Sequence, residues 1–141
     1  MLVQALTIRR AGDLPAARRR TAFRLAARAL LRFWKRSGRK HFREEEEVLL
    51  PAYARHVSLE RDRDVVRLLA DHAAIRAAYQ DLAAALAAGR PVEEPLTALG
   101  RRLHDHVRLE EEKVFPRMEA VLGEAELNAL GFTRLHGKKK P

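Results

Sequence analysis

Two segments of the chain repeat a spacing of histidine and glutamate that suits metal binding. The segments 41–51 and 106–116 share a leading His, an Arg two residues later, three consecutive Glu and a final Pro, so that six of eleven positions match. A helical residue four positions after another lies on the same face, so Glu45 shares a face with His41 and Glu110 with His106. Imidazole and carboxylate groups are both metal ligands. The repeat therefore predicts two matching ligand pairs.

A third histidine, His72, lies in a segment whose apolar residues recur at alternating spacings of three and four, as in a bundle seam. We expect five side chains to meet in the core: His41, Glu45, His72, His106 and Glu110. Three imidazoles and two carboxylates, in a chain without Cys, suit a non-haem iron or manganese centre in which carboxylates can bridge two metals. A single His/Glu pair is commonly only a helix-surface ion pair, and that reading stays open for each pair alone.

Other residues of the same types are expected to lie elsewhere. Glu46 and Glu111 are rotated away from the predicted ligand face and should face solvent. Three further histidines are set aside by their position along the chain: His56, His104 and His136. Trp34 and Tyr79 are predicted to pack in the core.

Helical periodicity and breakers predict the elements that carry these residues. We expect helices over about 14–38, 39–56, 58–88 and 93–122, with a short helix over 124–130 and a tail over 131–141. Pro51 and Pro116 are expected to kink their helices. The pattern predicts an all-α, up-down-up-down four-helix bundle in a single domain over residues 1–141, with the bundle at about 14–122.

Charge is concentrated at the beginning of the chain. The net charge is +9, and residues 1–40 hold 12 Lys or Arg against the single acid Asp13. We attribute this to an Arg-rich solvated helix face and do not expect a nucleic-acid partner, although steeply salt-dependent binding would reopen that alternative. A secretory signal and a membrane span are not expected, so the predicted compartment is the cytoplasm. The oligomeric state is left open.

The repeated segments resemble those of the hemerythrin-like, or HHE cation-binding, family, which carries His-Phe-x-x-Glu-Glu-x-x-Leu-Phe-Pro and His-x-x-x-Glu-Glu-x-x-x-Phe-Pro motifs. The stretch from Asp71 to Arg76 is similar to the family's acid-His-x-x-Ile motif, and the resemblance spans residues 14–122. It implies a four-helix bundle around non-haem iron, as a mono-iron or di-iron site held by the five residues above. It also implies binding or sensing of oxygen, nitric oxide, peroxide or iron.

The resemblance further implies a first-helix histidine, which this chain lacks. Arg20 occupies the matching seam position, and Arg cannot ligate a metal. Its side chain could instead pair with Glu45 or Glu110, or extend outward and leave the position to water. We therefore expect an altered site with one ion held well and a second held weakly. Two alternatives stay open: a metal-free bundle with a structural or regulatory role, in which Arg20 neutralises the carboxylates, and an enzyme of peroxide or nitric-oxide chemistry. A binding protein is favoured over an enzyme.

Overall fold

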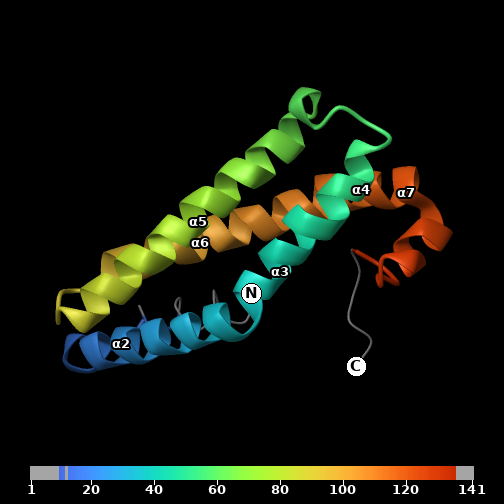
Figure 1. Cartoon of the computed structure of the whole chain (residues 1–141). Helices are drawn as coiled ribbons and strands as arrows, with labels where there is room; N and C mark the ends of the chain where they lie inside the picture. Colours follow the sequence, from blue (N-terminus) through green and yellow to red (C-terminus); the bar gives the residue numbers. More distant parts are fainter. Residues whose placement is uncertain (1–9, 12, 136–141) are drawn as a thin grey trace.

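The computed structural model describes residues 10–11 and 13–135, and the regular structure of this part of the chain is all helical. Its elements, shown in Figure 1, are α2 (Ala16–Phe33), the π-helical segment η1 (Trp34–Gly38), α3 (Arg39–Glu44), the π-helical segment η2 (Glu45–Leu49), α4 (Leu50–Ala54), the 3₁₀ turn η3 (Leu59–Arg61), α5 (Arg63–Ala87), α6 (Glu93–Leu109), the π-helical segment η4 (Glu110–Val114) and α7 (Phe115–Ala129).

The elements α2 to α4 follow one another without a turn and form one helical body, which we call the rod. The connection predicted near residue 38 is therefore wrong: Gly38 has helical dihedral angles of φ −62° and ψ −43°. Gly38 is buried beneath Trp34, and a Cβ atom added to it would overlap the indole ring. This glycine serves close packing rather than chain reversal. The described residues thus form three long helical bodies, not four clearly separate ones.

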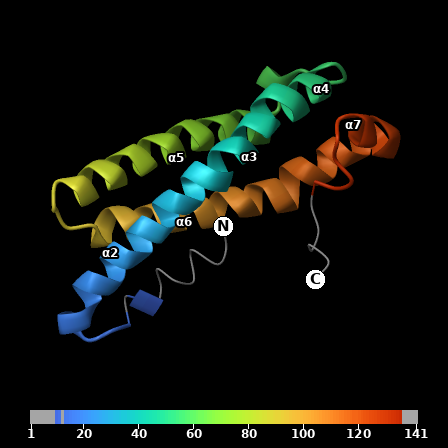
Figure 2. The ribbon, with the colours of Figure 1, turned by 60° about the horizontal axis from the view of Figure 1, so that its bottom comes forward.

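The three bodies are the rod, α5, and the run from α6 to α7. Helices α5 and α6 pack side by side, and the rod lies across them with α2 near one end and α4 beside α7 at the other (Figures 1 and 2). Arg24 in the rod donates to the carbonyl of Leu86 at the end of α5, at 3.4 Å. The rod and α6 run in the same direction, so the two repeated segments are parallel.

Local signals explain the ends of the other helices. Asp62 caps α5 by accepting hydrogen bonds from the backbone amides of Asp64 and Val65. The prediction that the long fourth helix stops near residue 123 is confirmed, because Gly123 breaks α7 with a φ of 72° that only glycine adopts readily. Residues 136–141, including His136 and most of the predicted tail, lie outside the described residues. No described helix is long and apolar enough to cross a membrane.

A layer of charged residues divides the hydrophobic core. One apolar cluster joins α2 to α5 and α6 and includes Phe23, Leu30, Trp34, Tyr79 and Leu99. The other joins α4 to α5 and α7 and includes Leu49, Tyr53, Leu68, Val114 and Met118. Four buried residues of the described chain are polar or ionisable and belong to neither apolar cluster: Glu45, His72, His106 and Glu110. The core therefore encloses a polar layer that needs a physical explanation.

Candidate metal centre

Four of the five candidate ligands come together inside the molecule. Glu45 begins η2, His72 lies in the middle of α5, His106 lies in the last turn of α6 and Glu110 begins η4. Each is at most 2% exposed, and each offers a ligand atom within 4.8 Å of those of the other three. Nitrogen and oxygen atoms that converge at this spacing can surround a single ion.

The polar atoms of these four residues face one another but form no hydrogen bonds with one another. His106 Nε2 lies 2.5 Å from Glu110 Oε1, and His72 Nε2 lies 3.1 Å from Glu45 Oε2. Neither approach has hydrogen-bond geometry, and six of their atoms are buried with no hydrogen-bond partner. A buried polar atom without a hydrogen bond costs free energy, and a cation bound among these atoms would offset that cost.

His41 lies at the edge of this layer rather than inside it. Its Nε2 atom is 3.1 Å from Glu45 Oε1 and 3.8 Å from Glu110 Oε2, while its side chain is 40% exposed. Burial lowers the pKa of His41, but contacts with Glu110 and Glu45 outweigh that effect and raise the pKa to about 10. Without a metal, His41 therefore carries a positive charge between two carboxylates.

The pKa of Glu110 is shifted in the opposite direction, below its usual value. Burial raises its pKa, but contacts with His106 and then His41 outweigh burial and lower the pKa to about 2. The carboxylate is therefore ionised at neutral pH, which is the form that binds metal.

Glu46, which we expected to face solvent, instead supports the cluster. Its Oε1 atom accepts a hydrogen bond from His72 Nδ1 at 2.7 Å. Both of its oxygens accept from the guanidinium of Arg76, at 2.8 and 2.9 Å. Arg76 and His72 hold the pKa of Glu46 below its usual value against the opposing effect of burial. With its Nδ1 proton engaged, His72 presents the Nε2 lone pair to the cluster.

Two π-helical turns begin at the carboxylates Glu45 and Glu110. In η2 the Leu50 amide donates to the carbonyl of Glu45, and in η4 the Phe115 amide donates likewise to Glu110, both across five residues. In each case the next residue is a proline, which has no amide proton and would crowd a regular α-turn. The extra residue in each turn shifts the helix phase, so that in η2 Leu49 rather than Val48 is buried in the core. Such π-turns are frequent at functional sites.

An aromatic ring closes one side of the cluster. Phe42 is fully buried and stacks on the His72 ring, with centroids 3.7 Å apart and an interplanar angle of 11°. It also meets the His106 ring edge-on at 5.2 Å. Trp34 packs against Phe42 and stacks on Tyr79, as expected of core residues. Phe42 and Trp34 therefore form an apolar wall on this side of the cluster.

The remaining candidates lie away from the layer. Arg20 is exposed on α2, so of the two expected arrangements the structure shows the one in which its side chain reaches solvent and not the one in which it pairs with Glu45 or Glu110. The reason is that the rod does not fold back, and α2 packs against the apolar cluster beyond the site. His104 and His56 are exposed and contact Asp105 and Glu126, respectively. Glu111 is exposed, as expected.

Comparisons with known proteins identify the family to which the chain belongs. No curated protein and no solved structure matches the sequence significantly. The family described as Hemerythrin, the hemerythrin HHE cation binding domain, matches residues 1–119. That match covers both repeated segments, His72 and the whole buried layer. The chain therefore belongs to the hemerythrin HHE cation-binding domain family.

Proposed function

We propose that this protein binds non-haem iron through its buried layer and uses the metal to bind or sense a small ligand. The observation that carries the proposal is the group of four buried side chains whose ligand atoms lie within 4.8 Å of one another. Membership of a cation-binding family supports it. A donor set of imidazole and carboxylate without thiolate suits iron or manganese.

The residues present fit one ion better than two. Glu45, His72, His106 and Glu110 would hold it, and their six unpaired buried atoms are the structural sign of that capacity. Iron would supply coordination positions open to oxygen, nitric oxide or peroxide. The chain supplies the ionised carboxylate of Glu110, the His72 tautomer fixed by Glu46, and the apolar wall at Phe42.

His41 gives the site its asymmetry. Its partly exposed ring can join the ligands only after losing the proton that the two carboxylates stabilise. We therefore propose one ion held firmly by the four buried residues and a second, weaker position at His41. This replaces the idea that Arg20 alters the site, because Arg20 is exposed on α2.

Metal analysis and titration test the proposal. Protein loaded anaerobically with ferrous iron should retain about one equivalent after desalting, and Glu110→Gln should weaken binding by about 100-fold or more, because the carboxylate loses its charge. Glu111→Gln changes the exposed neighbour of Glu110 and should bind as the wild type does. Absence of stoichiometric iron in the wild type, or equal binding by both variants, would remove the proposed function.

One observation favours a second candidate, a metal-free bundle with a structural or regulatory role. The protonated His41 supplies a positive charge within 3.8 Å of both carboxylates, which partly offsets their charge without a metal. In that case ferrous iron would leave the melting temperature unchanged. Iron binding to the folded state should raise it.

A further inference from the structure

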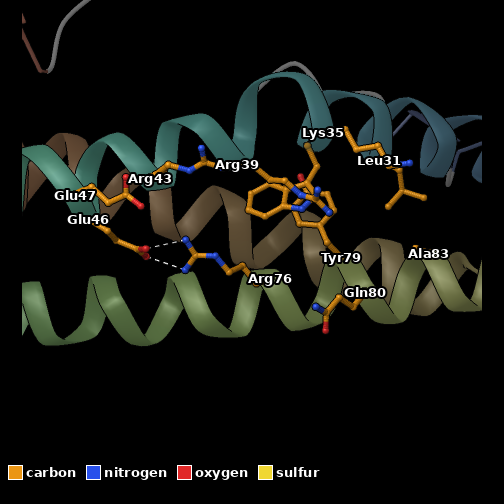
Figure 3. Close-up of a pocket in the computed structure, with 11 residues that line it drawn as sticks. Leu31, Lys35, Arg39, Arg43, Glu46, Glu47, Arg76, Tyr79, Gln80 and Ala83 are labelled. Atoms are coloured by element: carbon orange, nitrogen blue, oxygen red, sulfur yellow. Dashed lines mark hydrogen bonds and ion pairs between the residues drawn. The ribbon is translucent and has the colours of Figure 1, made fainter. Parts of the chain in front are cut away.

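A pocket of about 330 Å³ opens between the rod and α5, outside the buried layer. Figure 3 shows Lys35, Arg39 and Arg43 along the rod on one side of it and Arg76 and Tyr79 on α5 opposite. The Glu46–Arg76 ion pair closes the end nearest the cluster, so the pocket is a separate space. Its volume is at the lower end of the range for small-molecule sites.

The charge of the lining favours an anion. Lys35, Arg39 and Arg43 recur every four residues along the rod, are exposed, and form no ion pair with any other described residue. The acidic residues of the lining are Glu46 and Glu47, and Glu46 is already bound by Arg76 and His72. A surplus of positive charge therefore faces the pocket.

Tyr79 provides an independent sign of a missing partner. Its side chain lines the pocket and is 2% exposed, yet its hydroxyl is buried without a hydrogen-bond partner. Burial raises the pKa of Tyr79, so the hydroxyl keeps its proton and can donate. A buried donor without an acceptor is costly, and an oxygen atom of a bound molecule would relieve that cost.

We propose that this pocket binds a small anion that carries at least two phosphate or carboxylate groups. Arg39 and Arg43 are one helical turn apart, about 6 Å along the rod. Two guanidinium groups at that spacing can each engage a separate anionic group with paired hydrogen bonds. A bound anion would lie beside the ion pair that orients His72, but its binding does not depend on a metal at the cluster.

The single tryptophan makes the proposal directly testable. Trp34 is the chain's one tryptophan, and it lines the pocket. We would titrate the metal-free full-length protein with inorganic pyrophosphate and, separately, with citrate at fixed ionic strength, following Trp34 fluorescence and calorimetric heat. Saturable one-to-one binding is expected, and the anion that binds tighter distinguishes phosphate from carboxylate chemistry.

Paired variants separate the pocket from general charge attraction. Replacing both Arg39 and Arg43 by Gln should weaken binding by about 100-fold, since each charged hydrogen bond is worth about a factor of ten. Replacing Arg32 and Arg36 by Gln removes two exposed rod cations that do not line the pocket and should leave affinity within about twofold. All four positions are exposed, and circular dichroism would verify folding.

Three results would overturn the proposal. The first is no saturable binding of either anion up to about 10 mM, where a specific site should already be filled. The others are equal affinity of the Arg39/Arg43 variant and the wild type, or a loss of affinity in the Arg32/Arg36 control as large as that in the Arg39/Arg43 variant. None of them bears on iron binding, because the titrations use metal-free protein.

Discussion

Metal binding should expel a proton from His41, and the number of protons released can be counted. His41 Nε2 lies 3.1 Å from Glu45 and 3.8 Å from Glu110, and these contacts hold its pKa at about 10 in the metal-free protein. At pH 7 the ring is therefore protonated. A cation placed at the two carboxylates removes the interactions that stabilise that proton, whether or not His41 then joins the ligands.

The expected magnitude is about one proton per bound ion, which corresponds to about a tenfold gain in affinity per pH unit between pH 7 and 9. Calorimetric titration with ferrous iron in two buffers of different ionisation enthalpy gives the proton count directly. His41→Gln should release about one proton fewer than the wild type, because glutamine has none to lose.

His104→Gln is the matched control. His104 is exposed on α6 and contacts Asp105 outside the cluster, so its removal should leave the proton count unchanged. Equal proton release by the wild type and His41→Gln would refute the reasoning, since it would mean that the carboxylates do not hold the charge on His41.

Three further predictions follow from the geometry. Ser37→Pro should lower the free energy of unfolding by about 3 kcal/mol in urea titrations, because proline disrupts a helix interior, whereas tolerance would indicate a turn there. Glu46→Gln should weaken metal binding by about 10- to 100-fold while the exposed Glu47→Gln does not, and equal affinities would contradict a supporting role for Glu46. The metal-free protein should be most stable between about pH 4.5 and 6.5. The raised pKa of His41 gives a contribution that is complete below 6.5 and is lost as the pH rises through about 10. The lowered pKa of Glu110 gives one that is complete above 4.5 and is lost as the pH falls towards 2. Urea unfolding from pH 3 to 9 would test this, and a flat profile would disprove it.

Local periodicity was sufficient to locate most of the candidate site. His106 and Glu110 share a helix face because helix geometry fixes the direction of residues four apart, and the apolar residues around them mark that face as buried. His72 followed from the same seam argument. These inferences need only the sequence within two or three turns of one helix.

Where the prediction failed, side-chain packing decided the outcome. Glycine commonly follows the end of a helix, which predicts an end at Gly38, but beneath the Trp34 ring it is the residue that allows close approach within a helix. That single difference turned a predicted hairpin into the rod and left Arg20 exposed. Glu46 was missed because its partners His72 and Arg76 lie on α5, 26 and 30 residues further along the chain.

The sequence by itself determined which side chains share a helix face and that their chemistry suits a cation, because the period of a helix is a local property. Only the tertiary structure decided that the first two predicted helices are continuous, that His41 stands at the rim while four ligands are enclosed, and that Glu46 orients His72. The first feature rests on the packing of Trp34 over Gly38 within one helical segment. The other two depend on contacts between residues far apart in the chain, and no local pattern encodes the distance between them.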